Sequence, residues 1–435
     1  MAGGKFNGSK VRPGLYINFE QAALSRIQSG DRGVVALPVN APFGEAGKFH
    51  VIESDADCLK TFGVGISEIH DLREAKKNAR TVLAYRLTEG AKASTTIGTS
   101  TVMTVQARYG GELGNKITIK VANNPLDNTK KDVTTEVNGR VVDVQTVATI
   151  QELKANNYVT FSGTGTPENT TGKTLTGGTA GTITAQNYAD FLNKAEVEYF
   201  DVIAVPTDDT SIKASVEGFV KRLRDDEGKK IVGVLANHNA NYEGIINVAN
   251  GVILENGTVL TAKDCVSYVA GASAGAGINE SLTYSIYSGA IDANPRMRHS
   301  EVEAALKAGK LVFTFDNEFV RIEQDINSLV QYTNRAFTKN RVIRVLDAIN
   351  NDLTRAFNRS YLGQINNNRD GQAQLKTAID LYMLQLQDNG AIKNYNPETD
   401  CFIDEAKSVG DEVYVTLAVQ PVDSIEKIYL TVKVS

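Results

Sequence analysis

Both ends of the 435-residue chain carry the alternating apolar pattern of a β-strand. Residues 11–19 place Leu, Ile and Phe at every second position, and residues 426–435 do the same with Ile, Leu and Val. Chain ends usually fray, so a strand in such a place is stable only when another strand pairs with it. The partner can belong to the same subunit, or to another copy, which would make the protein a link in a mesh. The sequence leaves both alternatives open.

The composition predicts a soluble globular protein and argues against two classes of partner. Hydrophobic residues make up 42% of the chain and charged residues 22%, and the length suggests about two to four domains. The 46 basic and 51 acidic residues leave a net charge of −5, whereas a general nucleic-acid binder needs a basic excess. No stretch approaches the roughly 18 apolar residues of a membrane span. We therefore expect no nucleic-acid partner and no direct membrane insertion.

The spacing of cysteines and histidines predicts neither disulfides nor a metal site. Cys58, Cys265 and Cys401 are far apart and odd in number, as expected of reduced thiols. The histidines show no spacing typical of zinc ligands: His50, His70, His238 and His299. The first ten residues contain no apolar run, so we expect synthesis in the cytoplasm without a signal peptide. We expect no cofactor, and any extracellular role would require release by lysis.

The periodicity changes along the chain and predicts an α/β plus β fold with several domains. Residues 93–184 are rich in Thr, Gly and Asn and alternate in hydrophobicity, which indicates an all-β insertion. After the cap-like Thr184, buried-type strands alternate with helices, as in a parallel α/β sheet. The predicted parts are an N-terminal arm at 1–20, the N-terminal part of the core at 21–92, the insertion at 93–184, a central α/β domain at 185–325, and a C-terminal α+β domain at 326–435 with a terminal strand arm at 424–435.

Two long helices are predicted in the C-terminal domain, near residues 338–359 and 372–388. On a helical wheel, four arginines of the first helix fall in a narrow arc turned away from its apolar stripe: Arg341, Arg344, Arg355 and Arg359. A basic stripe on an exposed helix face could dock an acidic partner surface. The alternative is a solvated face, and the nearby Asp352 dilutes the positive charge.

Gly271, Ser273 and Gly275 fit the G-x-S-x-G nucleophile elbow of serine hydrolases. Two sets of residues could complete a triad with Ser273: Asp201 with His238, or Asp292 with His299. The segment consists almost wholly of Gly, Ala and Ser, however, so a chance match is easy. A tight strand-to-loop passage with close backbone packing explains it equally well. A cytosolic serine hydrolase of the α/β type is therefore the rival function.

Two weaker signals fall in the insertion. Gly172, Lys173 and Thr174 resemble a phosphate-binding loop, but the required first glycine is Pro167, which has no amide hydrogen. We therefore expect no nucleotide site there. The Thr- and Asn-rich residues 93–184 could also act as a carbohydrate-binding module, although this composition alone is weak support.

The chain resembles the contractile tail sheath family of myophages, defective prophage particles and R-type bacteriocins. Residues 107–115, Ala-Arg-Tyr-Gly-Gly-Glu-Leu-Gly-Asn, are close to the family's aromatic-Gly-x-x-Gly-Asn element. Further resembling segments follow in the family's order along nearly the whole chain: residues 10–19, 83–93, 175–181, 270–283, 309–313 with 325–329, 341–349 and 428–432. Each segment alone is weak, but their common order is specific.

The resemblance implies a structural protein rather than an enzyme. It implies a central subtilisin-like domain without protease activity and hexameric rings stacked around an inner tube. Contraction would then repack subunits as rigid bodies and drive the tube through a bacterial envelope, without ATP. The implied partners are other copies of the chain, the inner tail tube protein and baseplate proteins, within a virion or phage-tail-like particle.

The resemblance also assigns roles to residues of the arms and of the arginine stripe. The donated strands would carry the interface residues Val11, Leu15, Ile17, Phe19, Ile428, Tyr429, Leu430, Val432 and Val434. In the family the C-terminal domain lies toward the tube. Arg341, Arg344, Arg355 and Arg359 therefore become candidates for a tube-facing surface.

Overall fold

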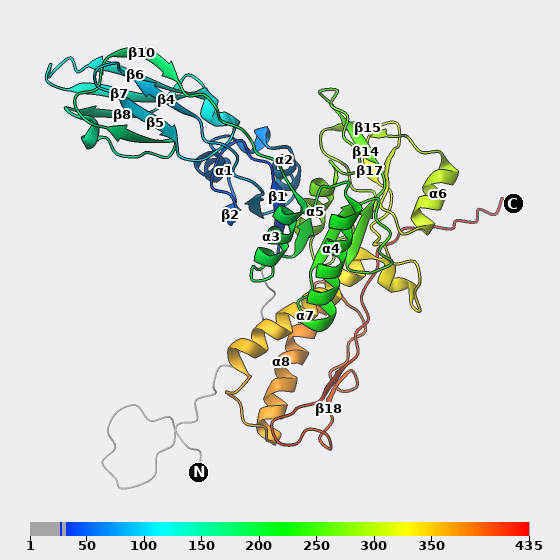
Figure 1. Ribbon diagram of the computed structural model, residues 1–435. Helices are drawn as coiled ribbons and strands as arrows, with labels where there is room; N and C mark the ends of the chain where they lie inside the picture. The colour runs from blue at the N-terminus through cyan, green and yellow to red at the C-terminus, as the bar shows by residue number, and fades with distance from the viewer. Residues whose placement is uncertain (1–26, 28–31, 435) are drawn as a thin grey trace, which may run out of the picture. The chain divides into compact units, whose positions relative to one another are not determined.

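The computed structural model describes Ile27 and residues 32–434 of the chain (Figure 1). The described residues form two compact units: residues 32–350 with 422–434, and Ile27 with residues 351–421. We call residues 32–350 the body and residues 422–434 the tail. The predicted N-terminal strand, residues 11–19, lies outside the described residues.

A six-stranded sheet organises the body, with strand order β13-β12-β11-β1-β3-β2. Five of its strands are parallel and β2 joins the edge antiparallel. The strands are β1 (Val34–Val39), β2 (Phe49–Ile52), β3 (Thr81–Arg86), β11 (Val202–Ala204), β12 (Val232–Ala236) and β13 (Ile245–Val248). The parallel α/β sheet predicted from residues 185–325 is therefore confirmed, and it continues into strands that precede the insertion.

Helices cover both faces of this sheet, so successive residues of β1 face two different cores. Val35, Leu37 and Val39 pack in one core and Val34 and Ala36 in the other. The first core receives side chains from α1 (Asp55–Phe62), α2 (His70–Lys76) and α5 (Val266–Gly275). The second receives them from α3 (Ala185–Ala195) and α4 (Thr210–Lys221), which continues as the π-helix η4 (Arg222–Asp226). Burial on both faces explains why β1 and β3 contain long apolar runs.

The start of α3 shows how the sequence specifies one of these helices locally. Thr184 is its N-cap, and the side chain of Asn187 accepts hydrogen bonds from the backbone N–H of Thr184 at 2.8 Å and from its hydroxyl at 2.9 Å. Phe191, Leu192 and Ala195 then recur at helical spacing and are buried. The helix predicted after Thr184 is confirmed.

The predicted all-β insertion is confirmed as a β-sandwich (Figure 1). One sheet has the order β4-β5-β9, with β4 (Ser94–Ile97), β5 (Met103–Ala107) and β9 (Val159–Gly163). The other has the order β10-β6-β7-β8, with β6 (Ile117–Asn123), β7 (Lys131–Val137), β8 (Arg140–Val147) and β10 (Thr170–Thr174). Two short 3-10 helices accompany them, η2 (Glu112–Lys116) and η3 (Ile150–Glu152). Lys173 and Thr174 of the rejected phosphate-loop match lie on strand β10.

Apart from one 3-10 helix, the remaining elements of the body follow β13. They comprise the pair β14 (Gly251–Leu254) and β15 (Ala290–Asn294), helix α6 (His299–Lys307), the hairpin β16 (Phe313–Phe315) and β17 (Val320–Ile322), and the 3-10 helix η5 (Arg335–Thr338). A further 3-10 helix, η1 (Ile66–Glu68), precedes α2.

The two predicted C-terminal helices are confirmed as α7 (Asn340–Ser360) and α8 (Arg369–Asp388). The spacing predicts a buried stripe of Leu375, Ile379, Met383 and Leu386 on α8; the last three are buried and Leu375 is partly buried. A two-stranded sheet follows, formed by β18 (Cys401–Ile403) and β19 (Val415–Leu417). Within the described part of the chain, no helix is long and apolar enough to cross a membrane.

Candidate subunit interface

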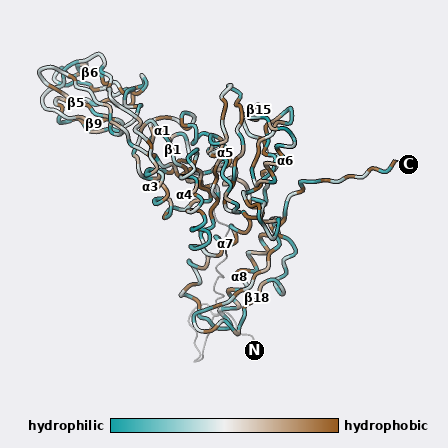
Figure 2. The backbone as a smooth tube through the Cα atoms, turned by 45° about the vertical axis from the view of Figure 1, so that its right-hand side comes forward, coloured by the Kyte–Doolittle hydropathy of each residue, from teal (hydrophilic) through white to brown (hydrophobic). Residues whose placement is uncertain are grey.

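The tail, residues 422–434, forms no strand in the described subunit, although its sequence alternates like one. From Ile425 onward its apolar side chains are largely exposed, from 73% at Val432 to 93% at Val434. Figure 1 draws the segment as an extended trace, and Figure 2 shows apolar residues along it. Ile428, Leu430, Val432 and Val434 occupy alternate positions, so an extended chain presents them on one face. The tail therefore exposes the pattern of a half-buried strand without a covering surface in the part that is described.

One residue of the tail is fixed to the body. The carboxylate of Glu426 accepts hydrogen bonds from the side chains of Gln324 at 2.7 Å and Thr283 at 2.8 Å, and it forms an ion pair with Lys339. The side chains of Glu426 and Lys339 are only 10% and 8% exposed. Burial by itself raises the pKa of Glu426, but its bonds to Lys339, Gln324 and Thr283 outweigh this and lower the pKa.

A second buried polar group lies directly beside this contact. Asp325 accepts hydrogen bonds from the Asn340 side chain at 2.8 Å and from the backbone N–H of Leu282 at 3.1 Å. Arg344 lies 3.7 Å from the same carboxylate and donates to the carbonyl oxygen of Glu280 at 2.7 Å. Since Gln324 and Lys339 are the sequence neighbours of Asp325 and Asn340, the two contacts belong to one polar region at the start of α7.

The position of Arg344 corrects the predicted arginine stripe. Its side chain is 3% exposed and bonded inside the body, so it is no part of an exposed face. The wheel placed it opposite the apolar stripe, but the segments around Glu280 and Asp325 cover that side of the helix. Arg341 is partly buried, whereas Arg355 and Arg359 are exposed. The exposed part of the stripe is therefore its C-terminal half.

The segment proposed as a nucleophile elbow lies within helix α5, not at a strand-to-loop turn. Its small residues serve close packing: a Cβ on Gly271 would lie 2.2 Å from the carbonyl oxygen of Ala75. Ser273 is 5% exposed. Close backbone packing, the second interpretation, is therefore correct, although the element is a helix rather than a strand end.

The residues named for the two triads are engaged elsewhere. Asp201 accepts from the backbone N–H of Gly33 at 2.9 Å and that of Val34 at 3.0 Å, and His238 lies 2.6 Å from Glu217. Asp292 accepts from Arg296 at 2.6 Å, and His299 lies 3.2 Å from Glu303. The geometry gives the serine hydrolase alternative no support.

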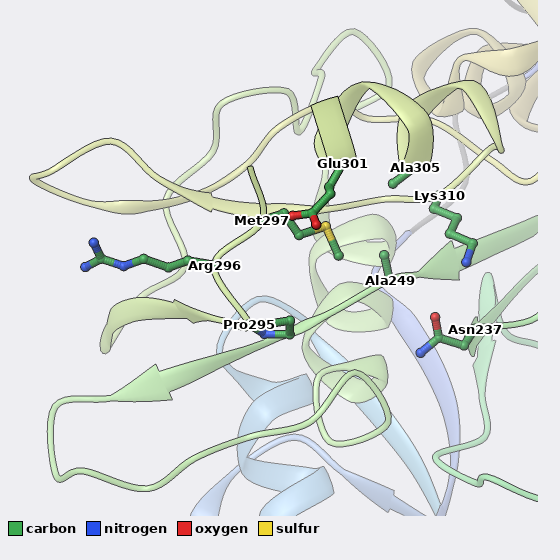
Figure 3. Close-up of a pocket in the computed structure, with 8 residues that line it drawn as sticks. All are labelled: Asn237, Ala249, Pro295, Arg296, Met297, Glu301, Ala305 and Lys310. Atoms are coloured by element: carbon green, nitrogen blue, oxygen red, sulfur yellow. The ribbon is translucent and has the colours of Figure 1, made fainter. Parts of the chain in front are cut away.

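A cavity of about 460 Å³ follows strands β12 and β13, where ligand sites of α/β sheets often lie (Figure 3). Asn237 and Ala249 follow the two strands, and Lys310 reaches the cavity from beyond α6. The carboxylate of Glu301 in its wall is bonded to Arg298 at 2.6 and 2.7 Å. No Ser, Cys or His is among the eight residues that line it, so it offers no Ser or Cys nucleophile with a histidine base.

Sequence reasoning missed the fixed point at Glu426 and its partner Lys339. One signal was available: Glu426 is the last acidic residue of the chain and begins the alternating segment. Its partners lie 87 to 143 residues earlier, however, so only the folded chain brings them together.

Family models of four phage tail sheath regions match consecutive parts of the chain. They are the tail sheath protein Gp18 domain III N-terminal region at residues 32–87, the beta-sandwich domain at 88–182, the central domain at 181–328 and the C-terminal domain at 332–435. Together they span nearly the whole described chain.

Relatives of the chain agree with these matches. The phage-like element PBSX protein XkdK of Bacillus subtilis is 44% identical over 469 residues, with all of both chains covered. The tail sheath protein of Clostridium phage phiCD119 is 26% identical over 215 residues, covering 48% of this chain and 60% of that protein.

Solved structures show the same fold. The sheath tail protein of Desulfitobacterium hafniense superimposes with a TM-score of 0.87 at 44% identity, covering 97% of this chain and 100% of that one. The Listeria innocua sheath tail protein gives 0.80 at 43% identity, covering 94% and 96%. The contracted helical sheath of the anti-feeding prophage matches with a TM-score of 0.59 at 15% identity, covering 98% and 99%, which shows the fold alone.

Proposed function

This chain belongs to the phage tail sheath family, and we propose that its subunits are joined into a sheath by donated C-terminal strands. It is a structural protein of contractile phage tails or injection systems, part of a virion or tail-like particle. The donation of strands, the ring symmetry and the contact with a tube are what we propose beyond this.

The exposed alternating tail is the observation that carries the proposal. Ile428, Leu430 and Val432 would cost free energy in water if they stayed exposed, and a sheet edge supplies both the apolar cover and the main-chain hydrogen bonds. Lys427 and Lys433 keep the free tail charged, which discourages unspecific strand pairing. A strand that is unpaired in its own described subunit, yet patterned for burial, fits donation to another copy.

The two-stranded sheet of β18 and β19 is the acceptor that we propose in the neighbouring copy. A sheet of only two strands leaves the outer edge of each strand open, and such a pair is marginal by itself. Phe402 on β18 is 50% exposed, and Tyr414 beside β19 is 46% exposed. An added strand would lengthen this sheet and cover part of its apolar surface.

Donation of the tail to a neighbouring copy does not satisfy both subunits of a pair, so it continues from copy to copy and builds a larger assembly. Tail-to-neighbour donation is heterologous, because donor and acceptor are different surfaces, and such contacts generate rings or helices. We propose hexameric rings stacked around an inner tube, with attachment to a baseplate. The solved anti-feeding prophage structures include a helical sheath and a baseplate with this fold. Synthesis in the bacterial cytoplasm and release by lysis are part of the same proposal.

Two finer features of the subunit also remain proposals. The parallel sheet with helices on both faces supports the subtilisin-like description of the central domain. Arg355 and Arg359 are exposed on α7 and are the candidates for contact with an acidic tube surface. The predicted domain division at residues 92–93, 184–185 and 325–326 belongs to this proposal.

Deletion of residues 427–435 tests the donated strand. We expect soluble subunits with unchanged circular dichroism that form no tubes in negative-stain electron microscopy. Substitution of one face by serine, Ile428→Ser with Leu430→Ser and Val432→Ser, should have the same effect. The matched control changes the opposite face, Thr431→Ser with Lys433→Gln, and should polymerise. Tubes formed by the deletion variant at the parent's concentration would show that the tail is no donor.

A further inference from the structure

We propose that Glu426 is a positioning residue, which fixes the point where the tail leaves the body and so directs the donated strand. We call its contacts with Thr283, Gln324 and Lys339 the clamp. This inference rests on the strand donation proposed above, and it adds a residue whose side chain is not part of the donated strand's apolar face.

The exposure of neighbouring residues singles out Glu426. Its side chain is 10% exposed, whereas Ile425 before it is 85% exposed and Ile428 after it is 83% exposed. The chain therefore turns a carboxylate toward the body and its apolar side chains toward the solvent. Hydrophobicity alone would produce the opposite arrangement, so the carboxylate is held by its specific partners.

The clamp is built on a part of the body that is itself firmly bonded. Lys339 directly precedes α7 and pairs with Ile326 through a backbone bridge. Thr283 also accepts a hydrogen bond from the backbone N–H of Asp325 at 3.0 Å. The buried Asp325 is in turn held by Asn340 and Arg344. The root of the tail is thus tied to the start of α7 and not to a loose loop.

A tail held at Glu426 docks on a neighbouring sheet at a lower entropic cost. A tail that swings freely loses orientational freedom when it adds to a neighbouring sheet, whereas a held root has lost part of that freedom already. The clamp also limits where the eight residues after Glu426 that the structure describes can reach. We therefore expect the clamp to change how readily subunits assemble while leaving the strand sequence untouched.

The test is the substitution Glu426→Gln in the full chain. Its matched control is Asp423→Asn, which removes an exposed carboxylate of the same tail that bonds only to the backbone N–H of Ser424 among the described residues. We expect Glu426→Gln to keep the circular dichroism spectrum and to raise the subunit concentration needed for tubes at least about tenfold, since charge-assisted hydrogen bonds are lost. The control should assemble at the parent's concentration.

A spin label attached at position 427 of a Lys427→Cys variant reports whether the clamp holds the tail in the free subunit. Cys58, Cys265 and Cys401 are buried, so labelling favours the introduced thiol. The spectral lines should sharpen in Glu426→Gln and stay unchanged in Asp423→Asn, because only the first releases the root. The reversed pair, Glu426→Lys with Lys339→Glu, should restore both the broad lines and assembly, and it supplies the test if Glu426→Gln unfolds.

The outcomes separate the clamp from strand donation itself. Assembly of Glu426→Gln at the parent's concentration with unchanged spectral lines overturns the clamp, even when the 427–435 deletion abolishes tubes. If the deletion variant polymerises normally, strand donation fails, and the spectral lines alone then decide whether the root is held.

Discussion

Burial distinguishes arginines that a helical wheel cannot separate. Arg344 and Arg359 occupy the same arc of α7, yet Arg344 is ion-paired with Asp325 and donates to the Glu280 carbonyl, while Arg359 is exposed. A buried guanidinium stabilises the fold through its partners, whereas an exposed one can act at an interface. The residue scale therefore divides the stripe into a structural part and a part that can bind.

The pair Arg344→Met and Arg359→Met makes this division testable. Arg344→Met leaves Asp325 buried without its cation, so we expect it to lower the free energy of unfolding by about 3 kcal/mol. Arg359→Met should change it by less than about 0.5 kcal/mol, as at most exposed positions, while weakening binding to the tube. Urea unfolding measures the first effect, and co-sedimentation with the tube protein measures the second. Equal stabilities for the two variants would contradict the assignment.

At the scale of elements, close backbone approach explains the small residues that imitate a catalytic motif. Gly271 of α5 faces the end of α2, with no space for a Cβ near the Ala75 carbonyl. Gly275 repeats the contact one turn later, where a Cβ would lie 2.2 Å from the carbonyl oxygen of Asn78. The two glycines bring α5 against α2 and the turn that follows it on one face of the parallel sheet.

Two glycine-to-alanine changes compare this contact with an open position. Gly271→Ala forces the helices apart, and we expect it to lower the free energy of unfolding by at least about 2 kcal/mol. A Cβ added to Gly218 of α4 would meet no atom within 4 Å. Gly218→Ala should therefore stabilise the protein by about 0.5–1 kcal/mol, because alanine favours the helix. Thermal unfolding distinguishes the two, and a neutral Gly271→Ala would refute the packing argument.

At the scale of the whole molecule, the chain enters and leaves the β-sandwich at one place on the rest of the body. The backbone N–H of Thr179 donates to the Ala91 carbonyl at 3.2 Å, and the Ala91 N–H donates to the Thr179 hydroxyl at 3.2 Å. The sheet strands β3 and β11 lie on opposite sides of the insertion in sequence, but both pair with β1. The six-stranded sheet is therefore complete without any strand of the sandwich.

Removal of residues 92–178, with a short glycine linker from Ala91 to Thr179, should leave the rest of the body folded. Phe43 packs against Tyr109 and Tyr158 of the sandwich, so the variant also carries Phe43→Gln. We expect cooperative thermal unfolding and retained tube formation, because the proposed donor and acceptor lie elsewhere. Loss of cooperative unfolding would mean that the sandwich is part of the folding unit.

The sequence alone determined the features that repeat over short distances. Helical spacing and the Thr184 cap predict α3, α7 and α8, and strand alternation predicts the insertion and the tail, because local periodicity decides which side chains can share a face. The ordered segments of family resemblance likewise identify the sheath protein before any coordinates. These properties depend on residues near one another in the chain.

Only the tertiary structure decided which of these faces are covered. Arg344 is buried by residues around Glu280 and Asp325, and Glu426 is held by side chains more than 80 residues away. The strand-like tail stays unpaired in the described subunit because pairing requires a second edge, which no local pattern can supply. Burial and pairing are properties of distant segments brought together, and for the tail we expect that partner to be another copy of the chain.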